Sequence, residues 1–256
     1  MTHTIAFAHF KGGTGKTTSC LSIAGYLAKN GAKVLAVDLD PQSNLTSGLG
    51  VDQSNLKNST FHIMSRRKRA RAVIVPTKIE NLDIAPATPY LVHATLRKYE
   101  RKDDAMILRN AIKRIKSIYD YILVDTPTSN GHFIVNGVTA SDSVVMVLDE
   151  GTFSLKGIDS FKKVFNSYCG KLGLRLNIAM ALVSKCDKSL LNFGKKRYRE
   201  VKKAAEEILG TTVHTIPYSD HIHESQKLSV PISHYKPNSR VGKAYMNVIG
   251  SIIDLK

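Results

Sequence analysis

Runs of apolar residues alternate with helical patterns along the whole chain. The apolar runs lie at residues 4–9, 33–40, 82–87, 119–127, 142–149, 177–185 and 212–217. Because Val, Ile, Leu and Ala fill these runs almost continuously, we expect strands that are covered on both faces, as in a parallel sheet. Helical patterns separate them, at residues 17–30, 104–117, 154–169, 189–209 and 239–254. The alternation predicts an α/β fold: a doubly wound, mostly parallel twisted sheet with helices on both faces.

Length and composition fit one globular unit. With 256 residues, 43% hydrophobic and 23% charged, the chain is expected to form a single domain over residues 1–256. No apolar stretch approaches the roughly 18 residues that a membrane span requires. The three cysteines, Cys20, Cys169 and Cys186, are far apart and lack metal-binding spacing. Such thiols are typical of a reducing cytosol, so we expect a cytoplasmic protein.

The charge balance changes this picture. The 37 Lys and Arg residues oppose 21 Asp and Glu residues, which leaves a formal charge of +16. The excess attracts polyanions, with nucleic acid the first expected partner and an anionic membrane the second. Three basic clusters stand out: five basic residues within 66–71, and stripes opposite the apolar face in 104–117 and in 189–209.

The stretch "FAHFKGGTGKTTSC" (residues 7–20) has the features of a phosphate-binding loop. It follows a strand and opens a helix, and Gly12, Gly13 and Gly15 allow positive φ and close approach of backbone N–H groups to phosphate oxygens. Lys16 is expected to reach the β- and γ-phosphates and Thr17 to offer a hydroxyl to Mg²⁺, at the positive end of the helix dipole. The usual first glycine of the motif is replaced by Phe10, and an additional lysine, Lys11, follows it.

This "KGGTGKTT" arrangement resembles the deviant Walker A motif of the ParA/MinD family of ATPases. Four further segments resemble that family's motifs: "VLAVDLDPQSNLTSGLG" (34–50), "YDYILVDTPTS" (119–129), "SLKGIDSF" (154–161) and "IPYSDHIHESQKLSVPI" (216–232). The resemblance implies a P-loop NTPase fold and an ATPase that dimerises around its nucleotide. It also implies that Lys11 reaches the phosphates bound by the other subunit, as an arginine finger acts in trans.

The resemblance assigns roles at the phosphate end of the site. Catalytic roles fall to Lys11, Lys16 and Asp40, with Asp40 positioning or polarising the attacking water. Thr17, Asp38 and Asp125 are the expected magnesium ligands or their support, although Asp38 could instead cap the helix that follows it. Because no Gln or Arg of the fast-hydrolysing kind is apparent, we expect slow intrinsic turnover that a partner accelerates. The predicted nucleotide-binding residues are Lys11, Gly12, Gly13, Thr14, Gly15, Lys16, Thr17, Thr18, Pro217 and Tyr218.

The sequence indicates the identity of the nucleotide base less directly than it indicates the phosphate site. The segment "SKCD" (184–187) resembles the [NT]-K-x-D element that binds guanine in related GTPases, but Ser184 departs from it. ParA-like proteins bind adenine mainly through backbone near the "IP" turn, here Pro217 and Tyr218. We therefore expect ATP and Mg²⁺ as cofactors, with GTP as the alternative. Two local departures are Thr128, where the family usually has a second proline, and "VMVLDEGTF" (145–153), which lacks a common proline.

The function expected from the resemblance is that of a ParA-type partitioning ATPase of the short form, without a helix-turn-helix before the loop. Its ATP-bound homodimer would bind double-stranded DNA without sequence preference, associate with the nucleoid, and be stimulated by a ParB-like centromere-binding protein. Such contacts go to phosphates. The candidate DNA-contacting residues are Arg66, Arg67, Lys68, Arg69, Lys195, Arg199 and Lys202.

Two other readings compete with this one. The alternative is a MinD-like positioning ATPase that cycles on a membrane; the terminal stripe in 239–254 suits packing on the core better, because its polar face is nearly uncharged. Stable membrane association is therefore not expected. An iron–sulfur carrier on the same scaffold would need cysteines that present a cluster, and the three cysteines show no such spacing.

Overall fold

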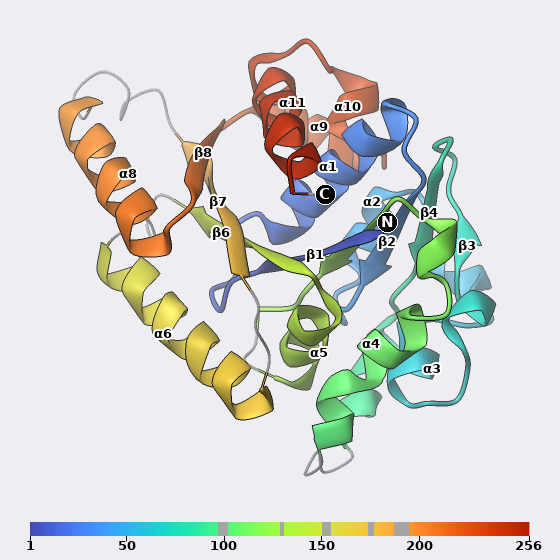
Figure 1. The fold of residues 1–256 in the computed structure, drawn as a ribbon. Coiled ribbons are helices and arrows are strands. Elements are labelled where there is room, and N and C mark those ends of the chain that lie inside the picture. Colours follow the sequence, from blue (N-terminus) through green and yellow to red (C-terminus); the bar gives the residue numbers. More distant parts are fainter. Residues whose placement is uncertain (97–101, 129–130, 150–154, 174–176, 187–194, 256) are drawn as a thin grey trace.

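An eight-stranded sheet forms the centre of the molecule, in the order β3-β4-β2-β5-β1-β6-β7-β8 (Figure 1). The computed structural model describes residues 1–96, 102–128, 131–149, 155–173, 177–186 and 195–255. Strand β3 pairs antiparallel with β4, and the other neighbouring strands run parallel. The strands are β1 (His3–Ala8), β2 (Val34–Asp38), β3 (Val75–Pro76), β4 (Leu82–Ala85), β5 (Tyr121–Asp125), β6 (Ser143–Asp149), β7 (Asn177–Cys186) and β8 (Thr212–Pro217).

Helices cover both faces of the sheet, which confirms the predicted fold class (Figure 1). One face carries α1 (Lys16–Lys29), α2 (Asn44–Gly48), α9 (Asp220–Lys227), α10 (Ile232–Tyr235) and α11 (Arg240–Ile253). The other carries α3 (Thr60–Met64), α4 (Ile107–Ile112), α5 (His132–Ala140), α6 (Leu155–Leu172) and α8 (Lys195–Leu209). Short 3₁₀ turns are η1 (Gln53–Asn55), η2 (Ala70–Ala72), η3 (Pro89–Leu96), η4 (Lys102–Met106) and η5 (Lys116–Ile118).

The two faces bury separate apolar cores, because side chains alternate along each strand. In β2 and β5, Leu35 and Ile122 pack with α4, α5 and α6, whereas Ala36 and Leu123 pack with α1 and α11. All four are almost fully buried. Burial on both faces accounts for the continuous apolar runs from which the strands were predicted.

The predicted helix at 104–117 is wrong in its extent, and a side chain of α5 supplies the reason. In a continuous helix the Leu108 N–H would donate to the Asp104 carbonyl. Instead the Leu108 N–H donates to Asn136 Oδ1 at 3.1 Å, while Asn136 Nδ2 donates to the Asp104 carbonyl at 2.8 Å. The Asn136 amide thus binds both the N–H and the carbonyl that a continuous helix would pair with each other. Only α4 (Ile107–Ile112) is α-helical, and η4 and η5 flank it.

Other differences concern elements with weak local signals. The sequence pattern did not predict α2, α3, α5, α9, α10 or the antiparallel β3. The predicted helix at 189–209 is described from Lys195 onward, and its earlier residues lie outside the described part of the chain. Among the described residues, no helix is long and apolar enough to cross a bilayer.

Strand register brings the acidic residues of two motifs together. Asp38 and Asp125 are register partners at the ends of β2 and β5, and Phe7 of β1 pairs with Asp125 on its other side. The carboxyl ends of parallel strands face the crevice in which open α/β sheets bind ligands. The loop after β1, both carboxylates and the ends of β7 and β8 therefore lie along one edge of the sheet.

Candidate nucleotide site

The loop between β1 and α1 adopts the backbone that a phosphate cradle needs. Gly13 and Gly15 have φ of 75° and 90°, in the left-handed region that favours glycine. Gly12 does not have positive φ, so it does not use the conformational freedom that glycine allows. Gly15 is the N-cap of α1 and offers no side-chain cap, which leaves the first N–H groups of the helix free for an anion.

The loop's two lysines lie in different environments. Lys16 is 5% exposed, and its ammonium donates to the Lys11 carbonyl at 3.2 Å. Burial lowers the pKa of Lys16, while Asp125 and Asp40 act in the opposite direction. The Lys11 side chain is 54% exposed, and its Nζ lies 3.5 Å from Asp149 Oδ2. One lysine therefore lies within the loop and the other on its outer side.

Asp125 is the best candidate for a metal ligand. It is fully buried, and within the described part of the chain its carboxylate oxygens have no well-formed hydrogen bond, although the Thr17 side chain interacts with them as a donor. Burial and then the Asp38 charge raise its pKa well above the ordinary range, and Thr17 and Lys16 act in the opposite direction. Buried oxygens without a well-formed hydrogen bond fit a role as ligands to a cation.

The chemistry of this donor set fits magnesium and does not form a closed metal cage. Among the described residues no group of three or more His, Cys, Asp or Glu side chains gathers as a metal site. Mg²⁺ is usually held by one or two carboxylates together with waters and substrate phosphates. Asp125 and the Thr17 hydroxyl could hold it in that way.

Asp38 is held by the backbone that follows β2. Its Oδ1 accepts from the Asp40 N–H at 3.0 Å, and its Oδ2 accepts from the Thr46 N–H and hydroxyl at 3.0 and 2.7 Å. These bonds cap the first turn of α2, the alternative role considered from the sequence, and its place in the metal shell stays a prediction. Burial raises the pKa of Asp38 to about 6. Asp40 is half-buried and accepts from the Gln42 N–H at 2.9 Å.

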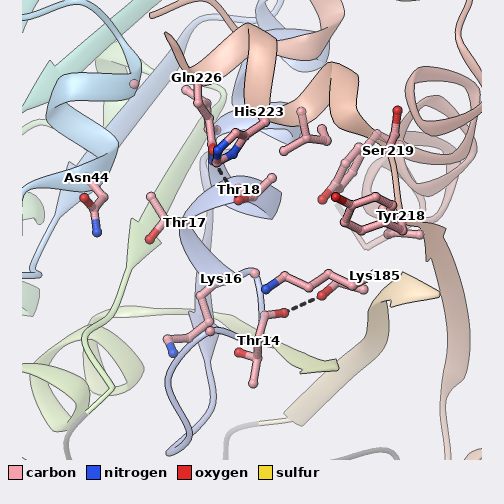
Figure 2. Close-up of a pocket in the computed structure, with 18 of the residues that line it drawn as sticks. Thr14, Lys16, Thr17, Thr18, Asn44, Lys185, Tyr218, Ser219, His223 and Gln226 are labelled. Carbon is pink, nitrogen blue, oxygen red and sulfur yellow. Dashed lines mark hydrogen bonds between the residues drawn. The ribbon is translucent and has the colours of Figure 1, made fainter. Parts of the chain in front are cut away.

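A cavity of about 740 Å³ extends from the loop to the turn after β8 (Figure 2). Its volume lies within the range typical of small-molecule sites. Lys11, Gly12, Asp38 and Asp125 lie outside the lining. The predicted residues that line it are Gly13, Thr14, Gly15, Lys16, Thr17, Thr18, Asp40, Pro217 and Tyr218.

At the far end of the cavity, Tyr218 is 63% exposed and its hydroxyl donates to Asp220 Oδ1 at 3.0 Å. The Tyr218 N–H donates to the Cys186 carbonyl at 2.9 Å, which joins the ends of β7 and β8. The adjacent Pro217 completes the turn. This end is therefore formed by a fixed backbone and an accessible aromatic ring.

The sequence reasoning missed several lining residues. Ser184 donates its hydroxyl to the Thr14 carbonyl at 2.6 Å, and Gln226 donates to the Thr18 hydroxyl at 3.1 Å. Asn44, Thr128, Lys185 and His223 also line the cavity, and Figure 2 shows most of these side chains around the first turn of α1. Ser184 and Lys185 belong to "SKCD", which was considered only as a base-binding element; Asp187 lies outside the described residues.

The predicted DNA-contacting residues lie in two separate places, the segment after α3 and helix α8. Arg66, Arg67, Lys68 and Arg69 are all exposed in the segment after α3. Arg66 is bound to Asp104 Oδ1 at 2.9 Å, and Arg67 lies over the Phe61 ring at 5.2 Å.

In α8, Arg199 is exposed and Lys202 lies 3.6 Å from Glu206. Lys195 begins that helix, and its side chain is outside the described set. The basic residues of α8 are thus partly paired within their own helix.

The fold and the loop define a class of protein. A mostly parallel sheet in which a glycine loop joins β1 to α1, with a buried Asp at the end of β5, is the arrangement of a P-loop nucleotide-binding protein.

Comparison with known proteins narrows this class. A family model described as an AAA domain, AAA_31, matches residues 2–181. The sporulation initiation inhibitor protein Soj of Bacillus subtilis is 33% identical over 244 residues, covering 95% of each chain. The chromosome-partitioning ATPase Soj of Treponema pallidum is 29% identical over 255 residues, covering 99% of this chain and 98% of the relative. The chain belongs to the ParA/MinD-type AAA_31 family, a family of ATPases.

A solved structure agrees with the expected cofactors. Cobyrinic acid a,c-diamide synthase from Mycobacterium smegmatis, with bound ATP analog and magnesium, is 26% identical and aligns with a TM-score of 0.83. The alignment covers 99% of this chain and 94% of that one. ATP and Mg²⁺, the cofactors expected from the sequence, correspond to the ligands of this structural neighbour.

Proposed function

We propose that the chain is a ParA-type partitioning ATPase that forms a sandwich dimer when it binds ATP and Mg²⁺. The observation that carries this proposal is the difference in burial between the two lysines of the loop. Lys16 is buried within the loop, whereas more than half of the Lys11 side chain is exposed and its ammonium lies 3.5 Å from Asp149 Oδ2. A cation on the outer side of the loop is placed to meet a second molecule. The relatives named as partitioning proteins support the general function.

The proposed hydrolysis uses two groups of the cavity lining, Lys16 and Asp40, and two groups outside it, Asp125 and Lys11. Lys16 neutralises charge on the β- and γ-phosphates, and Asp40, half-buried at the cavity wall, orients the attacking water. Asp125 and Thr17 would hold Mg²⁺, which neutralises phosphate charge when it is bound. Lys11 of one subunit adds positive charge at the phosphates of the other, so turnover stays slow until the dimer is formed and a ParB-like partner stabilises its active arrangement.

The segment 66–71 is the better candidate for the DNA surface. Arg67, Lys68, Arg69 and Arg71 are exposed, and within the described residues none of them forms an ion pair. Arg66 is bound to Asp104 and so anchors the segment. Unpaired cations held on an ordered segment suit phosphate contacts that do not depend on sequence.

Light scattering tests the dimer. With a non-hydrolysable ATP analogue and Mg²⁺ the wild-type protein is expected to double its mass. The Lys16→Ala variant is expected to lose nucleotide binding and remain a monomer. The Lys11→Ala variant is expected to keep nucleotide binding and lose the hydrolysis that depends on dimerisation. A wild-type protein that binds the analogue and remains a monomer contradicts the proposal, and unchanged turnover in Lys11→Ala contradicts the role in trans.

Sedimentation separates DNA from membrane as the partner. We expect ATP-dependent pelleting with double-stranded DNA of unrelated sequences, with affinity that falls steeply as salt rises. Addition of a centromere-binding protein should accelerate hydrolysis and release DNA. ATP-dependent pelleting with anionic liposomes and not with DNA would favour the MinD-like alternative. This comparison also tests the expected association with the nucleoid.

A further inference from the structure

A second lysine besides Lys16, Lys185, lines the cavity and has no role in the function proposed above. It is the penultimate residue of β7 and forms part of the cavity lining, together with the loop residues and Tyr218. Figure 2 shows its side chain extending into the cavity toward the first turn of α1. Its ammonium forms no ion pair among the described residues. Within the described residues, a cation without an ion-pair partner thus lies where a polyanion is expected to bind.

The backbone at Lys185 is held in a conformation that lysine rarely adopts. Its φ is 59°, in the left-handed region, and the pairing of β7 with β8 shifts register between Val183 and Cys186. For a residue other than glycine this conformation costs free energy, and such residues concentrate at functional sites when the surrounding structure enforces them. The conformation therefore calls for an explanation beyond strand formation.

The residue before Lys185 fixes this turn directly on the phosphate loop. The Ser184 hydroxyl donates to the Thr14 carbonyl at 2.6 Å. A Cβ added at Gly15 would lie 2.8 Å from the Ser184 oxygen, so the contact is close enough to require glycine there. The backbone that leads into Lys185 is thus joined to the loop through Ser184.

Strand order indicates which part of a nucleotide lies beside Lys185. The loop with Lys16 follows β1, Lys185 is near the end of β7, and the turn with Tyr218 follows β8. Strand β7 lies between β6 and β8, so Lys185 stands between the loop and the far end of the cavity. A nucleotide with its outer phosphates at Lys16 and its base at Tyr218 presents its innermost phosphate to this position.

We propose that Lys185 binds the α-phosphate of the nucleotide and is a positioning residue contributed by β7. This inference rests on the proposed function, because it requires a nucleotide in the cavity. Lys16 neutralises the transferred end, and Lys185 holds the part of the nucleotide that is the same in substrate and product. It therefore contributes to binding before and after hydrolysis and does not act on the bond that breaks.

The test compares Lys185→Asn with the wild-type protein by titrating ATP, ADP and AMP against each. Asn tolerates left-handed φ and removes the charge. We expect all three nucleotides to lose affinity by the same factor, about tenfold or more for a charge-assisted hydrogen bond. The melting temperature of the nucleotide-free protein should stay the same or rise, and Lys185→Arg should keep most of the affinity. Lys227→Asn, an exposed lysine outside the cavity lining, is the matched control.

Several results would overturn the inference. Unchanged affinity in Lys185→Asn would show that Lys185 does not contact the nucleotide. A loss confined to ATP would show that Lys185 contacts the outer phosphates and not the α-phosphate. A lower melting temperature without nucleotide, not restored by Lys185→Arg, means that Lys185 supports the fold only. Each of these leaves the proposed function intact as long as the wild-type protein binds nucleotide. Failure of the wild-type protein to bind any nucleotide contradicts the proposed function itself.

Discussion

Two buried carboxylates at the candidate site lower the stability of the nucleotide-free protein. Asp38 and Asp125 are fully buried at the ends of neighbouring strands, and burial raises the pKa of each. The native state then holds protons to a higher pH than the unfolded chain, in which aspartate titrates near its ordinary value of about 4. The contribution of these two carboxyls to stability is therefore most favourable at low pH and is lost as pH rises through their raised native pKa values, about 6 for Asp38. At neutral pH both charges destabilise the nucleotide-free protein.

The Asp125→Asn variant is predicted to be more stable than the wild-type protein at pH 8 and unable to bind nucleotide in a magnesium-dependent way. The substitution removes a buried charge, and the amide oxygen that replaces the carboxylate can still accept from the Thr17 hydroxyl. We expect a gain of about 1–3 kcal/mol, or a few degrees in melting temperature. The gain should shrink as pH falls toward the ordinary titration range of aspartate, because the raised pKa of Asp125 costs less stability there. Calorimetry of the nucleotide-free protein at pH 8 and at pH 5 measures it.

Asp103→Asn is the control for this prediction, because Asp103 is exposed and its variant should melt like the wild-type protein. A lower melting temperature for Asp125→Asn at pH 8 would show that the carboxylate has a stabilising partner. Equal magnesium dependence in the variant and the wild-type protein would contradict its role as a ligand.

At the scale of elements, local patterns predicted the strands and the phosphate loop, whereas the extent of one helix depends on a long-range contact. The seven predicted strands are present, because burial on both faces leaves a continuous apolar run in the sequence. Helix α5 escaped prediction because its segment is rich in β-branched residues and contains Gly137. The limit of the helix at 104–117 depends on Asn136, about thirty residues away. Such a contact leaves no periodic signal.

The same distinction holds in the candidate site. The glycines, Lys16 and Asp125 were predicted because each belongs to a short segment whose chemistry is local. Ser184 and Gln226 contact the loop region across separations of 170 and 208 residues. Their hydroxyl and amide groups have no spacing that would indicate this, so only the folded chain shows that they support the loop and α1.

The packing of α1 against the C-terminal helices gives a prediction about Gly25. Alanine normally stabilises a helix interior by up to about 1 kcal/mol relative to glycine. A Cβ at Gly25, however, would lie 2.2 Å from the Ser233 hydroxyl oxygen and 2.7 Å from the Pro231 Cβ. Pro231 cannot turn away, so the clash outweighs the propensity. Gly25→Ala is expected to lower the free energy of unfolding by about 1–3 kcal/mol, measured by urea denaturation.

Gly250→Ala in α11 is the matched control. A Cβ there has no atom within 4 Å among the described residues, so only the helix propensity changes. This variant should be more stable than the wild-type protein, by up to about 1 kcal/mol. If both variants were stabilised, α10 would be able to move away from α1, and the contact would not be rigid.

At the scale of the whole molecule, the proposed binding of DNA would use the net charge of +16 for long-range attraction and the exposed basic residues of 66–71 for contact. We predict that replacing Arg67, Lys68 and Arg69 with Ala weakens binding of the ATP-bound protein to any DNA sequence. The slope of log affinity against log salt should become shallower by about 0.9 for each phosphate contact that is lost. Binding isotherms at four or more salt concentrations measure both quantities.

A second triple variant distinguishes direct contacts with DNA from long-range attraction by the net charge. Lys227, Arg240 and Lys243 are exposed on α9 and α11, and their replacement with Ala removes the same three charges. If the segment 66–71 contacts DNA, this second variant should lose much less affinity and keep the wild-type salt slope, because the long-range field falls off within a Debye length of about 8–10 Å. Equal losses in the two variants would mean that DNA responds to total charge and that no part of 66–71 touches it. A loss greater in the second variant would place the DNA on the helices that cover the other face of the sheet.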